Sequence, residues 1–132
     1  MIICIIEFET KLGMEEEAQK WLAELMPLVE QFSGFQGKES YAHISGDGRV
    51  NTVSCWEDEK SLLAWTQDPT HQKAMVAGKD RIFSRYNIRI CSELRSYEHV
   101  AEQYIQVWLR HNLSHNLTTP SRQQGITSWN NG

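Results

Sequence analysis

The chain has 132 residues, 40% of them hydrophobic, and a formal net charge of −4 at pH 7. This length and composition are typical of one domain with a hydrophobic core, and a net negative charge without a lysine or arginine block argues against a nucleic-acid partner. No apolar run approaches the roughly 20 residues of a membrane-spanning helix, so no membrane partner is expected.

The N-terminus and the cysteines indicate where the protein works. The opening MIICII is followed at once by Glu7 and Glu9, and it has neither the length nor the basic leading region of a signal peptide. Cys4, Cys55 and Cys91 have no metal-type spacing. We therefore expect a cytoplasmic protein with reduced cysteines and no metal site.

The first two predicted elements are a strand and a long helix. Residues 2–9 form a strand pattern whose first half is apolar on both faces, so both faces should be covered. Residues 14–32 place their apolar side chains on one arc of a helix. Pro27 lies on the polar side of this helix, where the carbonyl that it leaves unpaired can bond water, so one kinked helix is expected.

A hairpin and a short helix follow. Residues 37–45 and 49–57 are typical of strands, and the Gly-Asp-Gly at 46–48 supplies the positive-φ residues of a tight turn. Asp58 is expected to cap a short helix over residues 59–67.

A second helix begins at Asp68 and Pro69, which are typical of an N-cap and of the first helical position. It should run to about Phe83 and lead into a last strand over residues 86–94. A titratable histidine falls on its predicted buried side, next to two very small residues. That side holds His71, Ala74, Met75, Gly78 and Ile82.

The predicted order of elements is that of the α+β, ferredoxin-like βαββαβ fold with an antiparallel sheet. Two helices can cover only one face of a four-stranded sheet, so a homodimer with its two sheets stacked face to face is expected. The domain is assigned to residues 1–98. Residues 99–132 are assigned to a C-terminal extension, in which a short helix is followed by a polar tail.

Three segments resemble a known family: LMPLVEQFSGFQGKESY, DGRVNTVSCWEDEKSLLAW and DPTHQKAMVAGKDRIFSRYNIRICSELRSY. In this order and spacing, they are similar to the antibiotic biosynthesis monooxygenase (ABM) family over residues 1 to about 98. The resemblance implies a protomer that pairs into a dimeric α/β barrel. Family members include cofactor-free monooxygenases of quinols and aromatic polyketides, haem-degrading proteins and proteins without an assigned reaction, so the fold alone does not choose among them.

The resemblance favours a cofactor-independent monooxygenase that oxidises a quinol-like or polycyclic phenolic substrate with O₂. Such a reaction needs a base that deprotonates the phenol, and a dry cavity in which the anion passes an electron to O₂. The glycines do not form the Gly-x-Gly-x-x-Gly turn of a flavin or nicotinamide site, so no cofactor is expected. The alternative is a non-catalytic dimeric module that binds a small aromatic molecule or has a regulatory role.

His71 is the candidate catalytic base, because its ordinary pKa of about 6.5 lets it accept a proton near neutral pH. A histidine at the edge of the core, bonded to a carbonyl or carboxylate, is the competing interpretation. Trp65 is a candidate pocket wall or an ordinary packing partner of Leu62. Tyr41 and His43 share one strand face, from which they could bind a phenolate or lie at a solvated or dimer surface.

Haem degradation fits the residues less well. Haem-degrading relatives carry an asparagine on the first strand, where this chain offers Glu7. Trp65 matches their tryptophan in type, but Met75 stands ten residues on, where the relatives have the histidine that ligates iron. His71 comes one turn too early for that role. Met75 shares the predicted helix face of His71 and is a candidate substrate-binding residue.

Overall fold

The structure, a computed structural model, describes residues 1–102 and 108–111. Met1–Glu93 form one compact unit, and the chain from Leu94 onward forms a second. Within the second unit, residues 108–111 are helical. The polar tail predicted over residues 112–132 lies outside the described residues.

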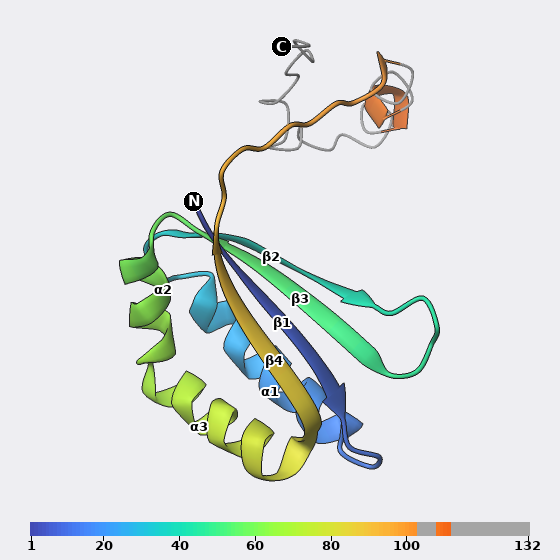
Figure 1. The fold of residues 1–132 in the computed structure, drawn as a ribbon, viewed down its shortest axis with the longest axis vertical. Helices are drawn as coiled ribbons and strands as arrows, with labels where there is room; N and C mark the ends of the chain where they lie inside the picture. The colour runs from blue at the N-terminus through green and yellow to red at the C-terminus, as the bar shows by residue number, and fades with distance from the viewer. Residues whose placement is uncertain (103–107, 112–132) are drawn as a thin grey trace. The chain divides into compact units, whose positions relative to one another are not determined.

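The first unit is an α+β fold with a four-stranded antiparallel sheet, as predicted (Figure 1). The strand order is β2-β3-β1-β4, the ferredoxin-like arrangement. In Figure 1 the helix α1 lies behind this sheet. The elements are β1 (Ile2–Thr10), α1 (Glu15–Val29), β2 (Phe35–Ala42), β3 (Arg49–Trp56), α2 (Glu59–Thr66), α3 (Pro69–Ala77), the π-helix η1 (Gly78–Ile82) and β4 (Phe83–Ser92).

Side-chain caps begin the two short helices at the predicted residues. Asp58 Oδ1 accepts a hydrogen bond from the Ser61 N–H at 2.8 Å. Asp68 Oδ1 accepts from the N–H groups of Thr70 and His71, both at 3.0 Å. These bonds satisfy N–H groups that have no partner within the helix, so α2 and α3 form separate helices with a fixed junction between them.

The longer elements differ from prediction mainly at their ends. Pro27 lies inside α1, as expected, but the helix ends at Val29, because the N–H groups of Gln31 and Phe32 bond to carbonyls three residues back. The last helix does not continue as an α-helix to Phe83. It becomes a π-helix at Gly78, and β4 already begins at Phe83.

The core lies between the helices and one face of the sheet. Cys4 of β1 and Trp56 of β3 are buried against Val29 of α1 and against Leu62 and Trp65 of α2. Because side chains alternate along a strand, this helix-facing side also carries the residues two positions away from each core residue. The opposite side of the sheet, called here the open face, has no helix of the compact unit over it.

The open face is apolar at its centre. Ile3 and Ile5 alternate with buried Cys4 along β1, and Ile5 pairs with Val53 of β3. All three side chains are partly exposed in the protomer. Asn51 Oδ1, on the same face, is buried without a hydrogen-bond partner. A buried acceptor without a partner costs free energy, so the open face of a single protomer carries an unsatisfied hydrogen-bonding group.

No helix within the described ranges has the length and apolar character needed to cross a membrane.

Candidate functional site

His71 and Trp65 form a stacked pair at the junction of α2 and α3. Their ring centroids are 4.3 Å apart and their planes differ by 12°. The Asp68 cap fixes the first turn of α3, from which the His71 ring reaches back over the end of α2. There its Nδ1 lies 3.0 Å from the backbone carbonyl oxygen of Trp65. Two contacts therefore hold the imidazole in one orientation.

The hydrogen bond of His71 defines which ring nitrogen carries the proton. A carbonyl oxygen can only accept, so Nδ1 must be the donor. In the neutral ring the lone pair then lies on Nε2. Over residues 1–102 and 108–111, no side chain or backbone group forms a hydrogen bond with Nε2. The neutral imidazole thus presents a free acceptor, as a general base requires.

The surroundings of His71 favour its neutral form. Burial is the main cause that lowers the pKa of His71 from its ordinary value of 6.5, and the positive charge of Lys38 acts in the same direction. The Trp65 carbonyl and the Asp68 carboxylate act in the opposite direction, and the net effect is a lowered pKa. The ring is therefore predominantly neutral at pH 7.

Trp65 is both a core residue and the support of this histidine. Its side chain is 8% exposed and belongs to the buried cluster with Leu62 and Cys4. The Phe32 ring packs edge-on against it, with centroids 5.0 Å apart. The structure therefore shows core packing for Trp65, and the same ring stacks on His71. Its role as a pocket wall stays a prediction.

The small residues after His71 allow close packing at the end of α3. A Cβ atom at Gly78 would lie 2.8 Å from Cε2 and 2.9 Å from Cδ2 of Phe83, so the glycine lets the helix approach the first residue of β4. Gly78 therefore opens no space at this point. Met75, which was predicted on the buried side of the helix, is 47% exposed. Its role as a substrate-binding residue stays a prediction.

Tyr41 and His43 do not join His71 within one protomer. Tyr41 is 52% exposed and alternates with Ser40, whose hydroxyl bonds buried Thr52 on the helix-facing side, so Tyr41 points to the open face. Its hydroxyl bonds the Glu39 carboxylate. His43 follows β2 in the exposed hairpin, where its Nδ1 lies 2.7 Å from the Ser45 hydroxyl. A substrate-binding role for Tyr41 and His43 stays a prediction.

Lys38 is a candidate that the sequence pattern did not single out. It pairs with Ser54 of β3, which itself pairs with buried Cys4, so the lysine lies on the helix-facing side of the sheet. Burial lowers its pKa. The alternation of the predicted strand over residues 37–45 already placed Lys38 on the same face as Ser40. The sequence did not show that this face is the one that the helices cover.

The strand β4 adds apolar surface to the helix-facing side. Ile90 and Ile88 pair with Cys4 and Ile6 of β1, so they point to the side that the helices cover. They are nevertheless 51% and 49% exposed. The helices thus leave part of this side uncovered at the edge strand.

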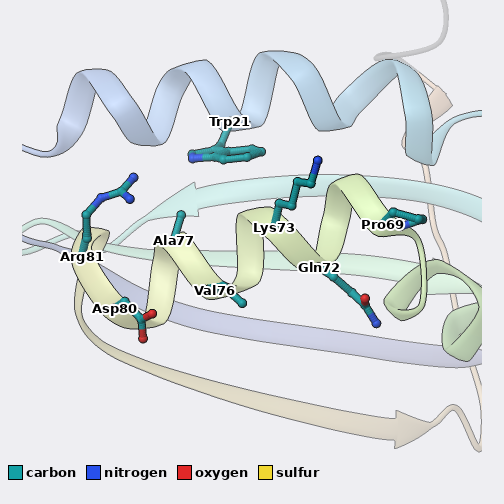
Figure 2. A pocket seen from close by; sticks show the side chains of 8 residues that line it. All are labelled: Trp21, Pro69, Gln72, Lys73, Val76, Ala77, Asp80 and Arg81. Atoms are coloured by element: carbon teal, nitrogen blue, oxygen red, sulfur yellow. The ribbon is translucent and has the colours of Figure 1, made fainter.

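A separate hollow of about 580 Å³ lies on the outer surface between α1 and α3 (Figure 2). Figure 2 shows the Trp21 ring facing α3, with Lys73 and Arg81 reaching up on either side of it. Arg81 also forms an ion pair with Glu17 of α1. None of the predicted site residues lines this hollow. In the described part of the chain, no three His, Cys, Asp or Glu side chains are grouped as metal ligands.

The fold and the sequence together define the class of the protein. The family model named antibiotic biosynthesis monooxygenase matches residues 1–77, more than half of the chain. The chain therefore belongs to the antibiotic biosynthesis monooxygenase family.

A curated relative supports this assignment. Over 66 residues the chain is 33% identical to the jasmonate monooxygenase ABM of Pyricularia oryzae, and this match covers 50% of the chain. It covers only 31% of that relative, so the chain spans about a third of its length.

Solved structures support the fold alone, because their sequence identity is low. A Deinococcus radiodurans protein described as a putative antibiotic biosynthesis monooxygenase has a TM-score of 0.67 and 13% identity, with 76% of this chain and 100% of that chain covered. A point mutant of SnoaB, a cofactor-independent oxygenase from Streptomyces nogalater, has a TM-score of 0.64 and 11% identity. That match covers 74% of this chain and 97% of SnoaB.

Proposed function

We propose that this protein is a cofactor-independent monooxygenase that oxidises a quinol-like or polycyclic phenolic substrate with O₂. The observation that carries the proposal is the free Nε2 of neutral His71, held in place by Trp65. Membership of a monooxygenase family and the structural similarity to a cofactor-independent oxygenase support it.

The proposed reaction begins with a proton transfer. The phenolic O–H bond breaks, His71 Nε2 takes the proton, and the electron pair stays on the substrate oxygen. The electron-rich anion then passes electrons to O₂. For a substrate of the anthrone type, a ring CH₂ becomes C=O, and the second oxygen atom leaves with the two hydrogens as water. The substrate supplies all the electrons, so the balance needs no further reductant.

Trp65 and Met75 are assigned to the wall of the substrate site. The stacked indole holds His71 in position, and half-exposed Met75 lies one turn further along α3. A planar aromatic substrate suits such surroundings, because aromatic and sulfur-containing side chains pack well against flat rings.

The test is O₂ uptake by purified protein, without added cofactor, with a panel of hydroquinones and anthrones. We expect uptake with at least one of them and a loss of about 100-fold or more in kcat for His71→Asn, because general-base catalysis contributes about that much. The matched control is His99→Asn, an exposed histidine outside the compact unit, which should leave the rate unchanged.

Two results would contradict the proposal. The first is a lack of O₂ uptake with every substrate. If the protein nevertheless bound one of these compounds measurably, the result would favour the non-catalytic binding module. The second is a His71→Asn variant as active as the wild type.

We further infer that the active form is a homodimer in which a second copy covers the open face. Two features of the open face support this inference. A second sheet would bury the partly exposed side chains of Ile3, Ile5 and Val53. It could also offer a hydrogen-bond donor to the unpaired Asn51 Oδ1. Light scattering at micromolar concentration should give twice the protomer mass. A monomer would contradict the inference.

We also infer a cytoplasmic location, since Cys4, Cys55 and Cys91 are all free thiols. Cell fractionation that finds the protein outside the cytoplasm would overturn this.

A further inference from the structure

Lys38 places a positive charge on the helix-facing side of the sheet, away from the acidic residues of the strands. The strands contain three acidic residues, Glu7, Glu9 and Glu39, and strand register places all of them on the open face. Lys38 lies on the opposite, helix-facing side, where the strands carry no carboxylate. Throughout residues 1–102 and 108–111, no side chain forms an ion pair or a hydrogen bond with its ammonium group.

The position of Lys38 costs free energy in the protomer. The side chain is partly buried, and a cation removed from water without a partner is destabilised. Burial lowers its pKa for this reason. The unpaired ammonium is therefore suited to an anion that enters the same space.

Lys38 and His71 act on the same region. Lys38 pairs with Ser54, the neighbour of Cys4, and Cys4 belongs to the same buried cluster as Trp65, on which His71 stacks. In keeping with this placement, the charge of Lys38 contributes to the lowered pKa of His71. One reaches this region from β2 and the other from α3. His71, the base that would create an anion, and Lys38, the unpaired cation, thus lie on the same side of the sheet.

We propose that the ammonium of Lys38 binds the anionic oxygen that forms when His71 removes a proton from the substrate. This rests on the proposed function and narrows its substrate class to phenols or enols whose ionising hydroxyl group lies at the Lys38 end of the ring. The O–H bond breaks, Nε2 gains the proton, and the electron pair left on the oxygen faces the ammonium group. Lys38 stabilises this anion more than the neutral phenol, so it favours ionisation before O₂ reacts.

Binding of 4-nitrophenol tests the proposal without any turnover. This phenol is resistant to oxidation, and its absorbance distinguishes the neutral molecule from the phenolate. The wild type should bind the phenolate and lower the pKa of the bound phenol. Lys38→Met should weaken phenolate binding about tenfold or more, the value of one charge-assisted hydrogen bond. The neutral ether 4-nitroanisole should bind both proteins equally.

Three further variants act as controls. Lys38→Arg keeps the charge and should retain most of the phenolate affinity, while Lys38→Gln should lose it even if the methionine variant fails to fold. Lys73→Met removes an exposed lysine that lines the outer hollow, and it should bind as the wild type does.

The outcomes separate this proposal from the proposed function. Equal phenolate affinity in the wild type and Lys38→Gln, or no binding by the wild type, would overturn the anion site. Phenolate binding that depends on Lys38, together with no O₂ uptake on any substrate, would uphold the anion site and overturn the monooxygenase. A folded Lys38→Gln variant that turns over substrate at the wild-type rate would overturn the role of Lys38 alone.

Discussion

Replacing Gly78 by alanine tests how closely α3 packs against β4. Gly78 has φ −59° and ψ −50°, ordinary helical angles that alanine adopts readily, so helix propensity alone would stabilise the variant by about 1 kcal/mol. The new Cβ, however, would lie 2.8 Å from the Phe83 ring. That ring lies against Phe8, with centroids 4.7 Å apart, so it cannot move away freely. Overpacking of this kind costs about 1–3 kcal/mol, which leaves a net loss of about 1 kcal/mol.

Urea denaturation of a double-mutant cycle measures this effect. Gly78→Ala should lower the free energy of unfolding in the wild-type background. In a Phe83→Leu background the aromatic ring is gone, and the same substitution should become neutral or stabilising. A Gly78→Ala variant more stable than the wild type would refute the reasoning, because it would mean that there is free space beside Gly78.

Three further substitutions give measurable changes in stability. The lowered pKa of His71 means that, as the pH falls below about 6.5, the unfolded chain binds this proton before the folded chain does, so the folded protein loses stability. His71→Gln should reduce this loss. If urea denaturation gave the same fall in the free energy of unfolding from pH 7 to pH 5.5 for both proteins, this prediction would be contradicted. Trp65→Ala should cost about 3–5 kcal/mol in denaturation, and a near-native value would exclude the indole from the core. Asp68→Ala should cost about 1 kcal/mol through the lost cap, and an unchanged midpoint would show that the cap contributes nothing.

Local chemistry made much of the fold predictable from the sequence. The caps at Asp58 and Asp68 depend on a side chain two or three residues from the N–H groups that it satisfies, so the sequence alone indicates them. Pro27 was placed correctly inside one helix because its position on the polar side could be read from periodicity. The order of strands and helices followed from such local signals.

What was not predicted depends on contacts between distant segments. The π-helix at Gly78–Ile82 has no signature in composition, and it ends where Phe83 enters the sheet beside Thr10. Half-exposed Met75 was predicted on the buried side because periodicity does not say how far a helix lies from the edge strand.

The candidate site was predictable only in part for the same reason. His71 and Trp65 lie six residues apart, and both were found from a helical pattern. Lys38 gains its significance only from the register of β2 on β3, which shows that no strand carboxylate shares its side of the sheet. Tyr41 kept two interpretations, a phenolate-binding residue or a residue of a solvated or dimer surface, because alternation defines two faces without saying which of them the helices cover.

The ring nitrogens of His71 give the most direct test of the central claim. Long-range ¹H–¹⁵N NMR spectra of the ¹⁵N-labelled protein, assigned with a His71→Gln variant, report which nitrogen is protonated and follow its titration. The structure predicts a protonated Nδ1, an unprotonated Nε2 at pH 7 and a midpoint below 6.5. A protonated Nε2 with a bare Nδ1, or a midpoint above 6.5, would contradict the assignment of His71 as the base.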